Sequence, residues 1–145
     1  KGFQGNVVIA VMVFLPFILG ASISGITPII IILCIMAFLT SLAKEIINDV
    51  KDIEGDRGYR STLPNTMGIK RSLAMARILL VLVILISLVP VMMLGIDIIY
   101  LIFIGMADLL LIVVMFTSYH RPVLAHRLHS AGMVLSLPAF LSLSI

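Results

Sequence analysis

The sequence predicts an all-α membrane protein. Three observations support this fold class: the composition, the length of the apolar segments and the placement of the charges. Of the 145 residues, 61% are hydrophobic and 12% are charged, and the mean hydropathy is +1.26. Soluble domains carry about 25% charged residues, and small ones leave much of their surface in water. Lipid is therefore the solvent that suits this chain. The net charge of +3 indicates a basic face on an anionic membrane rather than nucleic acid binding.

Five apolar segments are long enough, or nearly so, to cross a hydrocarbon core as helices, which takes about 20 residues. We expect these spans at residues 5–22, 26–44, 72–94, 96–117 and 129–145. Pro28 falls in the first turn of the second span, where a missing N–H costs little. Pro90 lies near the outer end of the third span, and Asp97 is expected to be the N-cap of the fourth. The chain is thus predicted to form a single bundle of about five transmembrane helices.

All ten Lys and Arg residues fall on one side of the membrane if the five spans alternate in direction. They are Lys1, the basic residues from Lys44 to Arg77, and Arg121 and Arg127. Because cytoplasmic loops are enriched in Lys and Arg, we expect a multi-pass protein of the cell membrane. Its N-terminus and the large charged segment at residues 45–71 would be cytoplasmic, and its C-terminus external.

The charged segment continues the second span. We expect that helix to run through Glu54 and to stop at Gly55. At about 100° per residue, four carboxylates fall within an arc of about 60°. This acidic stripe consists of Glu45, Asp49, Asp52 and Asp56, the last of them at or beyond the helix end.

Stacked carboxylates repel one another, so the acidic stripe needs cations, either Lys and Arg side chains or a divalent ion. Mg²⁺ prefers one or two carboxylates together with waters and substrate phosphates. Basic residues follow the stripe at Arg57, Arg60, Lys70 and Arg71. A solvated charged helix end is the plainer interpretation, but the strict one-sidedness of the acids favours a site for Mg²⁺ and a diphosphate.

These residues resemble a known motif. The run A-K-E-I-I-N-D-V-K-D-I-E-G-D-R-G-Y-R-S-T-L-P-N-T-M-G at residues 43–68 is similar to the second aspartate-rich motif of UbiA-type intramembrane prenyltransferases. Within that superfamily it looks most like the archaeal digeranylgeranylglyceryl phosphate synthases, and chlorophyll-synthase-like members share its N-D…E-G-D-R pattern. The resemblance covers essentially the whole chain. It implies the C-terminal part of a nine-helix prenyltransferase fold.

The resemblance implies a magnesium-dependent transferase. A geranylgeranyl (polyprenyl) group would pass from its diphosphate to a lipid-phosphate acceptor, geranylgeranylglyceryl phosphate, in archaeal ether-lipid biosynthesis. The motif's catalytic and metal-binding acids match Asp52 and Asp56, preceded by Asp49 and Glu45. The residues expected to bind the diphosphate are Arg57, Arg60, Lys51 and Lys70.

One part of the family pattern is missing from this sequence. The family's first aspartate motif, N-D-x-x-D-x-x-x-D, does not occur in it. We therefore expect the chain alone to be inactive, either as a fragment or as a protein that needs an N-terminal half as partner. Two other functions remain open: a UbiA-type enzyme with an aromatic quinone precursor or a chlorin as acceptor, and a non-catalytic membrane bundle whose acidic helix end binds surface cations.

Two further sets of polar residues stand out. Asp108 lies in the middle of the fourth span, where a carboxylate is costly and usually faces the bundle interior. A structural hydrogen bond is favoured slightly over contact with a substrate. His126 and His129 have an i, i+3 spacing that zinc can use, but a basic loop anchored at the membrane surface is the favoured interpretation.

Overall fold

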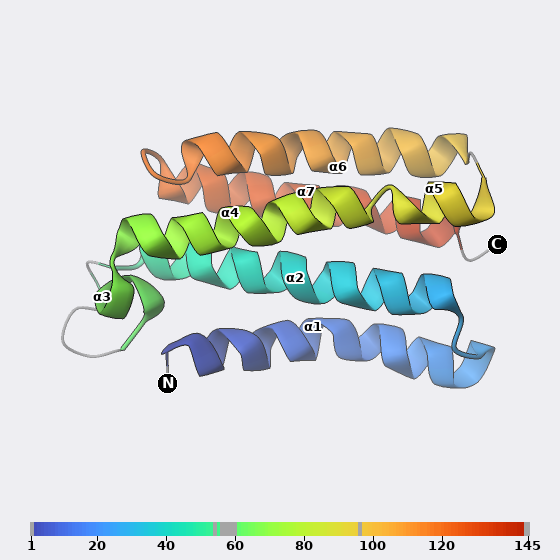
Figure 1. Ribbon diagram of the computed structural model, residues 1–145, viewed down its shortest axis with the longest axis horizontal. Coiled ribbons are helices and arrows are strands. Elements are labelled where there is room, and N and C mark those ends of the chain that lie inside the picture. The colour runs from blue at the N-terminus through green and yellow to red at the C-terminus, as the bar shows by residue number, and fades with distance from the viewer. Residues whose placement is uncertain (1, 54, 56–60, 96, 144–145) are drawn as a thin grey trace.

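The computed structural model describes residues 2–53, 55, 61–95 and 97–143, and every regular element in these ranges is a helix (Figure 1). Four helical stretches among them are long and apolar enough to cross a membrane, so the chain is an all-α, multi-pass membrane protein as predicted. The helices are, in chain order, α1 Gly2–Ser24, α2 Pro28–Lys51, α3 Leu63–Met67, α4 Ile69–Ile86, α5 Val89–Leu94, α6 Ile98–Thr117 and α7 Pro122–Ser142.

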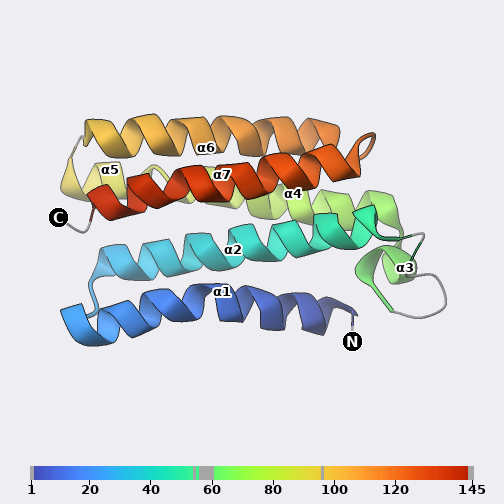
Figure 2. The same ribbon diagram turned by 180° about the vertical axis from the view of Figure 1, so that it is seen from behind.

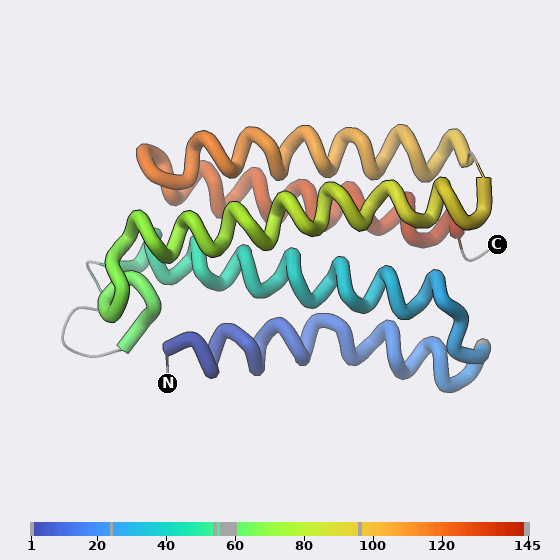
Figure 3. The backbone as a smooth tube through the Cα atoms, in the orientation of Figure 1, coloured from blue at the N-terminus to red at the C-terminus, as the bar shows by residue number. Residues whose placement is uncertain are grey.

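The long helices lie alongside one another in alternating directions (Figures 1 and 2). The short helix α3 and the connection between α6 and α7 lie at one end of the bundle, which we call the α3 end (Figure 3). The connection between α1 and α2 lies at the opposite end together with α5. Every Lys and Arg that the structure describes belongs to the α3 half of its helix or to a connection at that end. The charges therefore gather as the alternating spans predict.

Two helix starts show how local sequence sets the boundaries. The hydroxyl of Thr27 accepts a hydrogen bond of 3.3 Å from the backbone N–H of Ile30, and Pro28 follows in the first turn of α2. The carboxylate of Asp97 accepts a bond of 2.8 Å from the N–H of Tyr100 at the start of α6. Both side chains satisfy a backbone donor that has no partner within its helix. The N-cap prediction for Asp97 is confirmed.

The third predicted span is interrupted near its outer end. Helix α4 ends at Ile86, and α5 begins at Val89 with Pro90 in its first turn. Proline lacks an N–H, and its ring clashes with the carbonyl four residues earlier. At Pro90 that carbonyl belongs to Ile86, the last residue of α4, so the break falls where the proline requires it. At the other end of α4, Gly68 has a φ of 86°, which lets α3 turn directly into α4.

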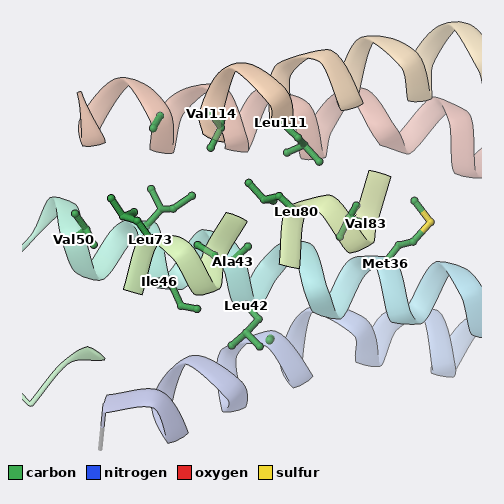
Figure 4. Close-up of a cluster of buried hydrophobic side chains, with 14 of the residues drawn as sticks. Met36, Leu42, Ala43, Ile46, Val50, Leu73, Leu80, Val83, Leu111 and Val114 are labelled. Carbon is green, nitrogen blue, oxygen red and sulfur yellow. The ribbon is translucent and has the colours of Figure 1, made fainter. Parts of the chain in front are cut away.

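Helix α2 is the centre of the bundle and packs against α1, α4 and α7. Half of the residues in its most apolar stretch are buried inside the structure, against 17% for α1. Figure 4 shows side chains from α2, α4 and α6 meeting in one cluster. Its buried members include Met36, Leu42, Ala43, Ile46, Val50, Leu73, Leu80, Val83, Leu111 and Val114. This core fixes the position of the polar end of α2.

Candidate active site

The described acids of the acidic stripe differ sharply in exposure. Glu45 is half-buried, Asp49 is 7% exposed, and Asp52 is open to solvent. Asp49 is positioned across the helix interface, because Nδ2 of Asn6 on α1 donates a hydrogen bond of 2.8 Å to its Oδ2. Asp49 thus lies in the contact between α1 and α2, and Asp52 lies at the surface of the α3 end.

The second predicted helix ends earlier than expected. Helix α2 stops at Lys51 and Asp52 is its C-cap, with its N–H bonded to the carbonyl of Asn48 at 3.0 Å. The prediction that the helix continues through Glu54 is therefore wrong. Without further apolar contacts on a packed face, a short charged extension has little to hold it helical. Three of the expected site residues, Asp56, Arg57 and Arg60, lie outside the described residues.

The basic residues expected around the diphosphate occupy two separate places. The ammonium of Lys51 lies 3.4 Å from Oδ1 of Asp52, an exposed ion pair of adjacent residues. Lys70, by contrast, lies in the first turn of α4, in a pocket with Arg77 and His120. The residues that line this pocket come from α4, α6 and the turn after α6, with none from α2. The sequence alone did not indicate that Lys51 and Lys70 would lie in different places.

Helix α7 brings two histidines to α2, which the sequence interpretation did not foresee. His126 lies within electrostatic range of Lys44, Lys51 and Asp52. Burial lowers the pKa of the His126 imidazole, and the ammonium groups of Lys51 and Lys44 lower it further, whereas Asp52 raises it. His129 is fully buried. The expectation of a loop on the membrane surface is therefore wrong for His129, because α7 begins at Pro122 and carries it into the bundle.

The chain that leaves the acidic segment passes close over the start of α1. A Cβ on Gly2 would lie 2.7 Å from the carbonyl oxygen of Ser61, closer than real Cβ atoms approach. Thr62, the next residue, is 2% exposed and is the N-cap residue of α3. Glycine at position 2 thus permits a close backbone contact between the start of α1 and the residues that lead into α3.

A metal ion held only by the described residues is not favoured by this geometry. No group of three or more His, Cys, Asp or Glu side chains in the described ranges is placed to hold one. Mg²⁺ needs only one or two carboxylates when waters and substrate phosphates supply the remaining ligands. The exposed Asp52 and the anchored Asp49 fit that limited requirement.

Asp108 has a direct structural role on α6. Ser87, which follows α4, donates a hydrogen bond of 2.7 Å from its hydroxyl to Oδ2 of Asp108. The hydroxyl of Tyr100 donates to the carbonyl of Ser87 at 2.6 Å. Asp108 also lines a mostly apolar cavity of about 100 Å³ that touches α1, α2, α4, α6 and α7. The carboxylate therefore ties α6 to the break between α4 and α5.

These features define the class of protein: a multi-pass helical membrane protein whose central helix carries carboxylates to one end of the bundle. The model of the UbiA prenyltransferase family matches residues 1–142, and the chain belongs to that family. The chain is 38% identical over 120 residues to a digeranylgeranylglyceryl phosphate synthase of Archaeoglobus fulgidus, covering 78% of this chain and 41% of the relative.

Two other curated relatives carry the same name. The protein of Methanosphaera stadtmanae is 35% identical over 111 residues, covering 76% of this chain and 41% of the relative. That of Haloquadratum walsbyi is 30% identical over 139 residues, covering 94% of this chain and 49% of the relative. The chain spans about half the length of these relatives or less. No solved structure gives a significant match.

Proposed function

We propose that the protein carrying this chain transfers a geranylgeranyl group from its diphosphate to geranylgeranylglyceryl phosphate, with Mg²⁺ as cofactor. The observation that carries the proposal is the end of α2, where Asp49 is anchored by Asn6 and Asp52 is exposed beside Lys51. Similarity to archaeal proteins named for the product of this reaction supports the choice of substrates. Family membership supports prenyl transfer as the chemistry.

In this reaction the bond between C1 of the prenyl group and the diphosphate oxygen breaks, and the diphosphate leaves with the electron pair. The acceptor hydroxyl forms an ether bond to the same carbon and releases its proton. An allylic diphosphate ionises when the charge of its leaving group is compensated, which is the chemistry that bound Mg²⁺ supplies. The residues that would hold the ion are Glu45, Asp49, Asp52 and Asp56.

The other residues of this chain have supporting tasks in the proposal. Arg57 and Arg60, with Lys51, would bind the diphosphate, and Arg suits bidentate contact with phosphate oxygens. The exposed apolar side chains of α1 would keep water from the reacting carbon. Lys70 would contribute only if its side chain reached beyond the pocket in which it lies.

The same proposal orients the protein in its membrane. The described Lys and Arg residues lie toward the α3 end, and cytoplasmic ends are enriched in these residues. We therefore place the α3 end in the cytoplasm and the end of α7 outside. In this orientation the acidic stripe faces the compartment that contains soluble Mg²⁺ and from which a prenyl diphosphate headgroup can approach.

Substitution of the two motif aspartates tests the proposal. Asp52→Asn and Asp56→Asn in the complete protein should each lower magnesium-dependent prenyl transfer by about 10²-fold or more, as expected when a group that stabilises developing charge is lost. Asp97→Asn is the matched control, because it removes a carboxylate at the opposite end of the bundle and asparagine also caps helices. Normal turnover by both motif variants would favour the non-catalytic bundle.

A further inference from the structure

A groove between α4 and α6 combines a basic end with an apolar channel. Its basic part is a pocket of about 350 Å³ at the α3 end, lined by Lys70, Arg77, Tyr119 and His120 among others. Its apolar part is a pocket of about 240 Å³ farther along the same two helices, lined by Val81, Leu85 and Ile112 among others. Phe116 lines both parts, so they adjoin at this side chain.

Arg77 has an environment that indicates a missing anionic partner. It lies two turns into α4, inside a stretch long and apolar enough to span the membrane. Its Nε is buried and has no hydrogen-bond partner among the described residues. A charged group within a span is costly, and such residues usually pair with another group. Lys70 lies seven residues earlier, on nearly the same face of α4.

The lining of the groove has the polarity of a phospholipid. Among the described residues that line its basic part are Lys70, Arg77 and His120, and none of these lining residues is acidic. Its apolar part is lined entirely by aliphatic, Met and Phe side chains. The basic part lies at the α3 end of the bundle. Tyr119, in the turn that follows α6, is one of its lining residues, and tyrosines commonly lie at membrane interfaces. Both parts lie between α4 and α6, which pack far less closely against each other than α6 and α7 do.

We propose that the α4–α6 groove binds one anionic phospholipid of the surrounding membrane. Its phosphate lies between Lys70 and Arg77, and one hydrocarbon chain lies beside Phe116 and Ile112. The guanidinium can make two parallel bonds to phosphate oxygens, while the ammonium acts as a point charge. None of the lining residues lies on α2, and Lys70 is the one residue that the groove shares with the diphosphate-binding set expected from the sequence. The apolar channel is what distinguishes a lipid from free phosphate as occupant.

Retention of single lipids by the purified chain, measured by native mass spectrometry, tests the proposal. The probes are dioleoyl phosphatidylglycerol, its phosphatidylcholine counterpart with the same chains, and inorganic phosphate. We expect one phosphatidylglycerol to be retained at concentrations at which phosphatidylcholine is lost. Arg77→Gln should weaken retention about five- to tenfold, whereas Arg127→Gln, which removes an exposed cation from α7, should not.

A second pair of variants tests the apolar channel without changing any charge. Ile112→Trp fills the channel, and Leu109→Trp adds the same bulk at an exposed position of α6 outside it. Only Ile112→Trp should weaken retention of phosphatidylglycerol, and both variants should elute as the wild type does on size exclusion. Equal losses of phosphatidylglycerol retention in Arg77→Gln and Arg127→Gln would show that the lipid is held by general surface charge, and would refute the proposed site. So would equal retention of both lipids, or full displacement of the lipid by inorganic phosphate.

Discussion

The hydrogen bond from Asn6 to Asp49 yields the sharpest prediction about the proposed active site. Asn6→Ala removes the Nδ2 donor, which lies 2.8 Å from Oδ2 of a carboxylate that is only 7% exposed. A hydrogen bond to a charged group contributes about 1.5–3 kcal/mol, and 1.4 kcal/mol corresponds to about tenfold in an equilibrium constant. If Asp49 is a metal ligand, its affinity for Mg²⁺ should fall about 10- to 100-fold, which is also typical when a ligand loses its supporting partner.

The assay is the initial rate of prenyl transfer by the complete protein as a function of Mg²⁺ concentration. Asn6→Ala should raise the half-saturating Mg²⁺ concentration while leaving the rate at saturating Mg²⁺ within a few-fold of the wild type. The Asp49 carboxylate itself is unchanged in this variant, so it should still bind Mg²⁺ when the ion is saturating. Ser22→Ala is the control on the same helix, because the hydroxyl of Ser22 bonds only to the nearby carbonyl of Leu19 among the described contacts.

Two outcomes would contradict this reasoning. In the first, Asp49→Asn impairs Mg²⁺ dependence but Asn6→Ala does not, which means that the bond does not position the carboxylate for metal binding. In the second, Asn6→Ala lowers the unfolding temperature and the maximal rate together with no change in half-saturation. Asn6 would then support only the packing of α1 on α2.

Three further predictions follow from other contacts. Gly2→Ala should lower the stability of the protein by about 1–3 kcal/mol and lower its activity, since the new Cβ would lie 2.7 Å from the carbonyl oxygen of Ser61. Gly5→Ala is the control, because a Cβ there would have nothing within 4 Å, and it should change neither activity nor melting temperature. Ser87→Ala should cost about 0.6–1.7 kcal/mol of unfolding free energy in detergent through loss of its bond to Asp108, whereas Asp108→Asn, which keeps an acceptor oxygen, should cost less. The isolated 145-residue chain should show no magnesium-dependent transfer, because it lacks a first aspartate motif, and clear turnover would contradict this.

The helical membrane fold could be predicted from composition because lipid imposes a simple rule. A backbone in hydrocarbon must satisfy its own hydrogen bonds, so long apolar segments become helices. Hydropathy does not mark where a helix ends, however. Helix α7 begins at Pro122 rather than at residue 129, since polar residues next to a span can continue its hydrogen-bond ladder. The five residues of α3 have no apolar period long enough to reveal them.

Local spacing predicts only part of the candidate site. Placing Glu45, Asp49 and Asp52 on one face requires only the helical repeat. The bond between Asn6 and Asp49 joins residues 43 positions apart, and nothing in the local pattern indicates it. The burial of His129 likewise depends on how α7 packs against α2. One signal was available for Asn6, an amide near the start of a mostly apolar helix, which in a membrane usually finds a polar partner.

The cavity lined by Asp108 bears on where a prenyl chain would lie. Its volume of about 100 Å³ is well below the roughly 300 Å³ at which ligand pockets usually begin. A geranylgeranyl chain of twenty carbons therefore does not fit inside this cavity. The carboxylates of α2 approach the side of the bundle covered by α1, because Asp49 contacts Asn6 there. Most large apolar side chains of α1 are exposed, among them Met12, Leu15 and Leu19. For a diphosphate bound at the end of α2, an apolar tail is thus best accommodated along the exposed surface of α1, against lipid or further helices.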